Sequence, residues 1–115
     1  MDALRAAGHE AVGSDVGSPA GGTTHYLPLD VRDPDSIASV LAEVKPDAVL
    51  HLGGIAFVPL AWTQPQRVFQ VNTIGTLNVL DAVRQHRPAA RVLVVTSAEA
   101  YGSHPAPAPL AEDAP

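Results

Sequence analysis

The stretch Arg91–Gly102, with the sequence RVLVVTSAEAYG, is the feature that most constrains the fold of this chain. Val92–Val95 is a continuous apolar run, the pattern of a parallel-sheet strand that is covered on both faces. Polar side chains, among them Ser97 and Glu99, follow the run directly. In open α/β sheets, ligands bind at the carboxyl ends of strands. The stretch predicts either such a site or an ordinary polar loop after a buried strand, and these residues alone leave both open.

Composition narrows the class of protein. A chain of 115 residues suffices for one small domain. The net charge of −5 and the lack of a Lys/Arg run argue against a nucleic-acid partner. The absence of cysteine excludes disulfide and thiolate chemistry and fits a reducing compartment. The five histidines lack metal-ligand spacing, and neither a signal core nor a bilayer-spanning run is present. We therefore expect a cytoplasmic protein without a metal site or a membrane partner.

The first third of the chain predicts two short strands. The residues up to Gly8 are typical of the end of a helix. One strand is expected to end at Asp15, and Val16–Thr24 is expected to be a loop because it is rich in Gly and Ser. The second strand, His25–Val31, contains Pro28, which suggests the edge of a sheet.

Helices and strands then alternate. Asp33 is a good N-cap for a helix that Pro46 ends, and Asp47–Leu52 is the third predicted strand. Ile55–Thr63 is predicted to be a loop that carries Phe57, Pro59 and Trp62.

The longest predicted helix runs from Pro65 to Pro88, with Gly75 as a close packing contact. Arg91–Thr96 is the fourth strand, and Ala98–Pro115 lacks periodicity. The alternation predicts an α/β fold with βαβ units and a doubly wound parallel sheet.

Six segments, in this order, carry a resemblance to a known family: VGSD, LPLDVRD, PDAVLHLGG, FVPLAWTQP, VNTIGTLNVLDAVR and VVTSAEAYG. The chain resembles the extended short-chain dehydrogenase/reductases, specifically the NAD-dependent epimerase/dehydratase group that acts on nucleotide sugars. Within that group it is most similar to the GDP-mannose 4,6-dehydratases and their companion 4-keto-sugar reductases. The resemblance covers residues 1–115 and implies a Rossmann fold.

The resemblance implies NAD as the cofactor. Asp15 matches the acid that accepts hydrogen bonds from the adenosine ribose, which favours NAD over the 2′-phosphorylated NADP. Asp30 and Val31 match the pair that borders the adenine. The turn Leu52, Gly53 and Gly54 matches the small residues beside the cofactor's ribose and phosphates. Taken alone, Asp15 could equally be a loop residue. The residue types favour a turn residue at Asp30 and a packed histidine, rather than a catalyst, at His51.

The resemblance also implies catalytic residues. Ser97 matches the hydroxyl that hydrogen-bonds the reacting sugar oxygen, and Asn72 matches a helix asparagine that orders the site. Glu99 falls where the dehydratases carry a base, although Ala98 replaces the usual hydroxyl or acid before it and leaves reductase or epimerase chemistry open. Tyr101 is assigned to packing.

A hydrolase triad is the other arrangement of catalytic residues that the sequence suggests. Ser97, His104 and Asp113 occur in an order that such a triad could use. No GxSxG motif surrounds the serine, however, and this argues against a hydrolase.

Two of the family's motifs have no match in this sequence, the GxxGxxG loop that holds the pyrophosphate and the YxxxK pair. We therefore expect a partial NAD-binding Rossmann domain over residues 1–115 that lacks the first strand, the glycine-rich loop and the substrate domain. The family's strand order places that first strand between the strands that end at Asp15 and Leu52. Such a fragment is expected neither to fold robustly nor to turn over substrate.

For the full-length protein the resemblance implies a homodimer that exchanges hydride with C4 of a nucleotide sugar. Two alternatives differ in class. One is a non-catalytic dinucleotide-binding regulatory protein on the same fold, since a fold alone does not fix a function. The other is an unrelated flavodoxin-like domain.

Overall fold

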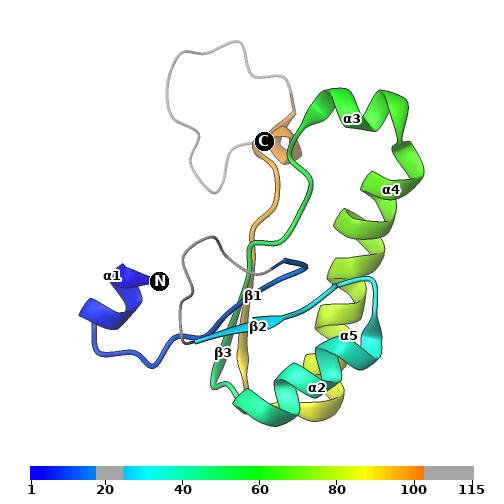
Figure 1. Ribbon diagram of the computed structural model, residues 1–115. Coiled ribbons are helices and arrows are strands. Elements are labelled where there is room, and N and C mark those ends of the chain that lie inside the picture. The colour runs from blue at the N-terminus through cyan, green and yellow to red at the C-terminus, as the bar shows by residue number, and fades with distance from the viewer. Residues whose placement is uncertain (18–24, 103–115) are drawn as a thin grey trace.

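The structure is a computed structural model that describes residues 1–17 and 25–102, except for the side chains of residues 98 and 99 (Figure 1). Its elements follow in chain order: α1 (Asp2–Ala6), β1 (Gly13–Asp15), β2 (Tyr26–Pro28), α2 (Pro34–Val44), β3 (Ala48–His51), α3 (Val58–Thr63), α4 (Pro65–Phe69), a π-helical segment (Gln70–Gly75), α5 (Thr76–His86), β4 (Arg91–Val94) and a 3-10 helix (Ala98–Tyr101).

The strands form two parallel pairs. β1 pairs with β2, with Gly13 opposite Tyr26, and β3 pairs with β4, with Ala48 opposite Arg91. Among the strands of the described residues, β1 and β3 each have one neighbour. Parallel strands separated by helices confirm the predicted α/β class, and Pro28 does lie on a strand with a single partner, as its missing N–H requires.

The core lies between two helices and one face of the β3–β4 pair. α2 and α5 lie side by side against these strands in Figure 1. The buried residues of the core come from those two helices and are Ile37, Leu41, Val79, Ala82 and Val83. Val49 of β3 and Val92 of β4 pack against them from the sheet. Helical spacing on α2 and α5 thus provides the apolar faces that hold the strands.

The opposite face of the β3–β4 pair is exposed. Leu50 is 49% exposed and Leu93 is 53% exposed, and Val95 beyond β4 is also exposed. The prediction that the run Val92–Val95 is covered on both faces is therefore wrong for the part of the chain described. Alternate side chains of a strand point to opposite faces, and within the described residues the helices cover only one.

Local signals at helix ends are confirmed. Gly8 follows α1 with a φ of 85°, the left-handed conformation for which glycine is preferred at helix ends. The Asp33 side chain caps α2 by accepting a hydrogen bond of 3.0 Å from the Asp35 amide. The last turn of α2 ends at Lys45, which is left-handed with a φ of 50°.

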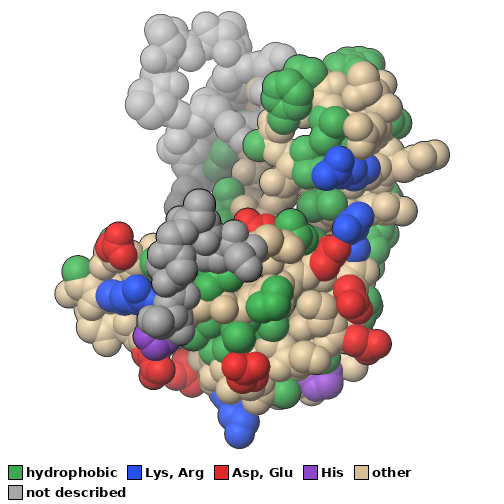
Figure 2. Space-filling view, viewed as in Figure 1, with side chains coloured by type: hydrophobic (Ala, Val, Ile, Leu, Met, Phe, Trp, Pro, Cys, Tyr) green, Lys and Arg blue, Asp and Glu red, His purple; other side chains and the backbone are tan. Residues whose placement is uncertain are grey.

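The predicted loop over Ile55–Thr63 is wrong in its second half, because Val58–Thr63 forms α3. Pro59 lies in the first turn of this helix, where its missing N–H costs nothing. The helix is short and exposed, and Trp62 is 83% exposed. Figure 2 shows hydrophobic side chains gathered on the surface around α3 and α4. Six residues without an amphipathic pattern carry little periodic signal, which is why the sequence did not predict a helix here.

The long predicted helix is present but is not a regular α-helix. It consists of α4, the π-helical segment and α5, and it ends before Pro88. Gly75 closes the π-helical segment, and a β-carbon built on it would lie 2.5 Å from Cγ2 of Val31. The predicted packing role of Gly75 is confirmed, since no side chain fits between this helix and Val31.

No helix within residues 1–17 and 25–102 is long and apolar enough to cross a membrane. Most of the predicted loop Val16–Thr24 and of the predicted tail Ala98–Pro115 lies outside the described residues.

Candidate functional site

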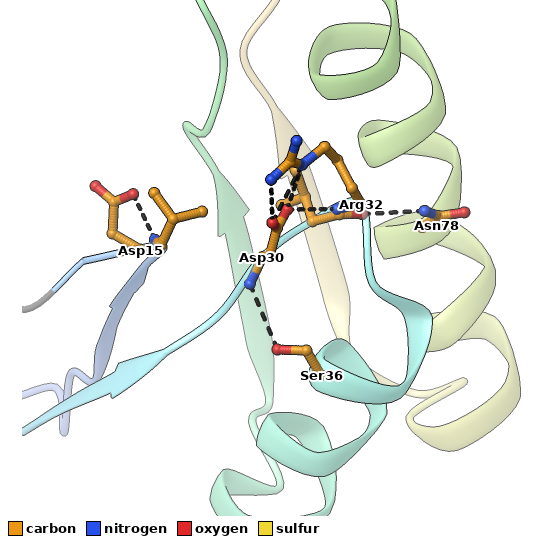
Figure 3. Close-up of polar contacts among 7 residues, drawn as sticks. Asp15, Asp30, Arg32, Ser36 and Asn78 are labelled. Carbon is orange, nitrogen blue, oxygen red and sulfur yellow. Dashed lines mark hydrogen bonds and ion pairs between the residues drawn. The ribbon is translucent and has the colours of Figure 1, made fainter. Parts of the chain in front are cut away.

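Polar groups follow the carboxyl ends of the strands, where parallel α/β sheets bind ligands. Asp15 is the last residue of β1, and Asp30 lies two residues beyond β2. Figure 3 shows both aspartates on the same side of the β1–β2 pair. Residues 52–54, the segment that the resemblance predicted as a turn, follow β3 as an irregular stretch for which we keep that name. Ser97 lies three residues beyond β4.

The Asp15 carboxylate is exposed and held by its own backbone. Its Oδ1 accepts a hydrogen bond of 2.7 Å from the Val16 amide, which fixes the direction of the side chain. The pKa of Tyr26 on β2 is raised, first by desolvation of its ring and second by the negative charge of Asp15. An exposed carboxylate of fixed direction can accept hydrogen bonds from the hydroxyls of a ligand.

Asp30 is already engaged by Arg32 (Figure 3). Its Oδ1 accepts hydrogen bonds from the Arg32 amide at 2.9 Å and from Nε at 3.0 Å, and its Oδ2 accepts one from Nη2 at 2.6 Å. Hydrogen bonds from Arg32 lower the pKa of the Asp30 carboxyl. The Asp30 amide in turn donates to Oγ of Ser36 at 3.4 Å. The carboxylate is thus rigid, and Arg32 takes up part of its hydrogen-bonding capacity. An acid and a base two residues apart carry no distinctive signal in the sequence, so Arg32 was not predicted as the partner of Asp30.

Val31 is held against the long helix from two sides. The Nδ2 group of Asn78 donates a hydrogen bond of 3.0 Å to the Val31 carbonyl, and the Val31 side chain lies against Gly75. The residues Gly75 and Asn78 of the VNTIGTLN motif therefore fix the chain just after β2. This leaves the position of Val31 independent of any ligand.

The turn after β3 is tied to the same helix at both ends. His51 is 7% exposed, and its Nε2 lies 3.0 Å from Oγ1 of Thr76, which confirms it as a packed histidine. Desolvation lowers the pKa of His51. At the other end, the Asn72 side chain pairs with both backbone groups of Ile55, accepting from its amide at 2.7 Å and donating to its carbonyl at 3.0 Å.

Gly53 and Gly54 lie inside this turn with exposed backbone. A β-carbon on Gly53 would lie 3.4 Å from the His51 ring, and one on Gly54 would lie 3.5 Å from Oδ1 of Asn72. Both positions therefore accept a methyl group, but a larger side chain would rise from the turn. Small residues leave the turn open to close approach by a ligand. The Asn72 residue is exposed, and its side chain has the backbone of Ile55 as its partner.

Ser97 is exposed at the start of the loop after β4, and its carbonyl accepts a hydrogen bond of 3.1 Å from the Ala100 amide. Tyr101, assigned to packing, is 38% exposed. The side chain of Glu99, together with His104 and Asp113 of the weighed hydrolase triad, lies outside the described residues. The serine thus lies three residues beyond the end of β4, and the roles given to Ser97 and Glu99 stay predictions.

This arrangement defines a class: a parallel α/β protein with fixed carboxylates, a small-residue turn and a hydroxyl at strand ends. Comparison with known proteins then identifies the family. The model of the GDP-mannose 4,6 dehydratase family matches residues 3–115, and the chain belongs to that family, within the NAD-dependent epimerase/dehydratase group of extended short-chain dehydrogenase/reductases.

Individual relatives are similar over part of their length. The GDP-6-deoxy-D-mannose reductase of Pseudomonas aeruginosa is 40% identical over 73 residues, which cover 64% of this chain and 24% of the reductase. The UDP-glucose 4-epimerase of Stenotrophomonas maltophila, solved with bound NAD and formylated UDP-arabinopyranose, matches with a TM-score of 0.81 and 28% identity over 96% of this chain and 36% of that one.

A third relative was solved with the phosphorylated cofactor. The protein RMD from Pseudomonas aeruginosa, complexed with NADPH, matches with a TM-score of 0.63 and 33% identity over 82% of this chain and 34% of that one. Structural relatives thus bind NAD or NADPH. The chain spans about a quarter to a third of the length of these three relatives.

Proposed function

We propose that this chain forms part of the dinucleotide-binding domain of an NAD(P)-dependent enzyme that acts on nucleotide sugars. The observation that carries the proposal is the set of exposed polar groups at the carboxyl ends of parallel strands, in a chain that the family model matches over residues 3–115. The relatives that were solved with NAD or NADPH support the cofactor class.

The residues would hold the cofactor as follows. The Asp15 carboxylate fits the two hydroxyls of an adenosine ribose, because it is exposed and needs only donors. Asp30 and Val31 would border the adenine, with the remaining lone pairs of Asp30 facing its amino group. Leu52, Gly53 and Gly54 would allow the cofactor's ribose and phosphates to approach the backbone. NAD is favoured over NADP because a carboxylate repels a 2′-phosphate.

The chemistry proposed is hydride exchange at C4 of the sugar, and the nicotinamide supplies the redox step when bound. Ser97 would donate or accept the hydrogen bond at the oxygen on C4, which orients the sugar and supports proton transfer. Asn72 would act through the backbone of Ile55, as a residue that orders the site. Glu99 would be a base only if the reaction includes elimination of water.

The rest of the domain is proposed to come from segments outside these 115 residues. A further parallel strand would fit between the unpaired edges of β1 and β3 and join the two pairs into one sheet. The exposed side chains Leu50 and Leu93 would be covered by helices from the same segments, packed on the second face of that sheet. The pyrophosphate loop, the YxxxK pair, the substrate domain and the dimer interface would belong to those segments.

The test uses the whole protein as its gene encodes it. NAD(H) and NADP(H) binding is measured by calorimetry, and turnover is measured with GDP-, dTDP- and UDP-sugars. Asp15→Asn is expected to weaken NADH binding and to reduce the preference over NADPH. Ser97→Ala is expected to lower kcat by 10²–10⁴-fold, the range of acid–base catalysis, while NADH binding is unchanged.

Two results would contradict the proposal. Full activity of the Ser97→Ala variant would remove the serine from the mechanism. Tight dinucleotide binding without turnover of any sugar would favour the non-catalytic regulatory protein.

A further inference from the structure

We propose that His51 and Thr76 are positioning residues that, together with Asn72, hold the turn of residues 52–54 in one conformation before any ligand binds. We call these three side chains the turn clamp. The proposal rests on the proposed function in one respect, namely that this turn contacts a dinucleotide.

Thr76 lies beside both Asn72 and His51. Its hydroxyl lies 2.7 Å from the Asn72 carbonyl oxygen and can only donate to it, because a carbonyl has no proton. That carbonyl is available because the Thr76 backbone amide donates to Thr73 instead of Asn72. A hydroxyl has one proton, so the Thr76 oxygen is an acceptor toward its other neighbour.

The contact with Thr76 determines the tautomer of His51. The other neighbour of the Thr76 oxygen is Nε2 of His51, at 3.0 Å. This nitrogen must therefore carry the hydrogen, and the neutral ring has its unprotonated nitrogen at Nδ1. The Nδ1 edge faces Gly53, where a β-carbon would lie 3.7 Å away. The Nδ1 side of the ring thus lies against Gly53, while Nε2 donates to the Thr76 oxygen of the long helix.

The attachments of His51 and Ile55 lie close together on the long helix. His51 and Ile55 flank the turn, and both are tied to one stretch of helix, at Thr76 and at Asn72. Asn72 uses its side chain on Ile55 and its carbonyl on Thr76, so the two attachments share one residue. A turn held at both ends by the same helix has few conformations left to lose when a ligand binds.

The experiment measures the clamp without and with a ligand. Histidines labelled with ¹⁵N in the whole protein report the His51 tautomer, and hydrogen exchange reports the amide of Ile55, which donates to Oδ1 of Asn72. Thr76→Val removes the hydroxyl at nearly constant shape, whereas Thr76→Ser keeps it. Thr63→Val is the matched control, because Thr63 makes a similar hydroxyl bond to the Leu60 carbonyl of α3 with no histidine beside it.

We expect a single Nε2–H tautomer in the native protein and in Thr76→Ser. In Thr76→Val we expect mixed tautomers, exchange of the Ile55 amide about five- to tenfold faster, and NADH binding weaker by a similar factor. His51→Gln, which retains an N–H donor, is expected to keep slow exchange, and His51→Leu is expected to lose it. These two variants give the answer if Thr76→Val does not fold.

The proposal is overturned if the native protein shows an Nδ1–H tautomer or a mixture, or if Thr76→Val and Thr63→Val are alike. A failure of the proposed function is distinct. If the protein shows the expected tautomer and exchange pattern but binds neither NADH nor NADPH, the clamp proposal stands and the proposed dinucleotide binding is refuted.

Discussion

At the scale of residues, the charged group after β2 is an ion pair of Asp30 and Arg32 rather than a single carboxylate. Arg32 reaches both oxygens of Asp30 from two residues away, so the carboxylate keeps one direction. Both side chains remain partly open to water, and the pair therefore contributes little to stability by itself. Its value is geometric, because it presents the free lone pairs of Asp30 in a constant position.

Arg32→Ala should raise the pKa of Asp30 toward its ordinary value, because the hydrogen bonds from Arg32 are what lower it. The native Asp30 favours folding above the ordinary pKa of an aspartate, and this contribution falls as the pH drops through the pKa of the folded state. The Asp30 carboxyl carbon, followed by NMR during acid titration, measures the change. Arg84→Ala should shift Asp81 instead, and an unchanged Asp30 in Arg32→Ala would refute the pairing.

His51 should make the folded protein less stable as the pH falls. Its pKa is lowered by burial, so the unfolded chain binds the proton more tightly. The stabilising contribution is complete above the ordinary pKa of about 6.5 and is lost as the pH falls below it. Urea unfolding of the whole protein from about pH 5 to 8 should show this slope, and His51→Gln should reduce it. The exposed His86 provides the control, and equal slopes in the native protein and His51→Gln would contradict the prediction.

At the scale of elements, sequence predicted the structures whose signals are local. α2 was predictable because Asp33, Pro34 and the apolar spacing agree, and β4 because of its continuous apolar run. α3 was missed because it is short and exposed. The π-helical segment was not predicted, because the apolar spacing that predicts a helix does not distinguish a π-helical turn from α-helical ones.

In the candidate site, too, some features could be predicted from the sequence and others could not. Strand ends are visible in sequence, so the positions of Asp15 and Ser97 could be predicted. The engagement of Asp30 depends on how the turn brings Arg32 back over the carboxylate, and the tautomer of His51 depends on Thr76, 25 residues away. Such facts follow from tertiary contacts, which a single sequence does not display.

Gly75→Ala should destabilise the whole protein by about 1–3 kcal/mol, the usual cost of overpacking. The added carbon would lie 2.5 Å from Cγ2 and 3.0 Å from Cβ of Val31, so either the helix or the chain after β2 must move. Gly54→Ala is the matched control, because its added carbon meets only Asn72 at 3.5 Å. Thermal unfolding compares the two variants, and equal midpoints would show that Val31 yields without cost.

At the scale of the whole molecule, the described residues leave apolar surface and strand edges uncovered. Residues 1–115 expressed by themselves should associate or unfold without a sharp transition, because β1 and β3 each have an unpaired edge and the apolar side chains Leu50 and Leu93 are exposed. Size-exclusion chromatography and urea unfolding test this, with the protein encoded by the whole gene as the reference. A monomer that unfolds cooperatively would contradict the prediction and the proposed covering layer together.

The π-helical segment of residues 70–75 also sets the angular relation between the two ends of the long helix. Each residue of an α-helix advances the chain by about 100° around the axis. Deleting one residue from this segment would restore a regular helix, but it would turn α5 relative to α4 by about that angle. Val79 and Val83 would leave the core, and Thr76 and Asn78 would lose their partners. The chain therefore tolerates substitutions along this helix far better than a change in its length.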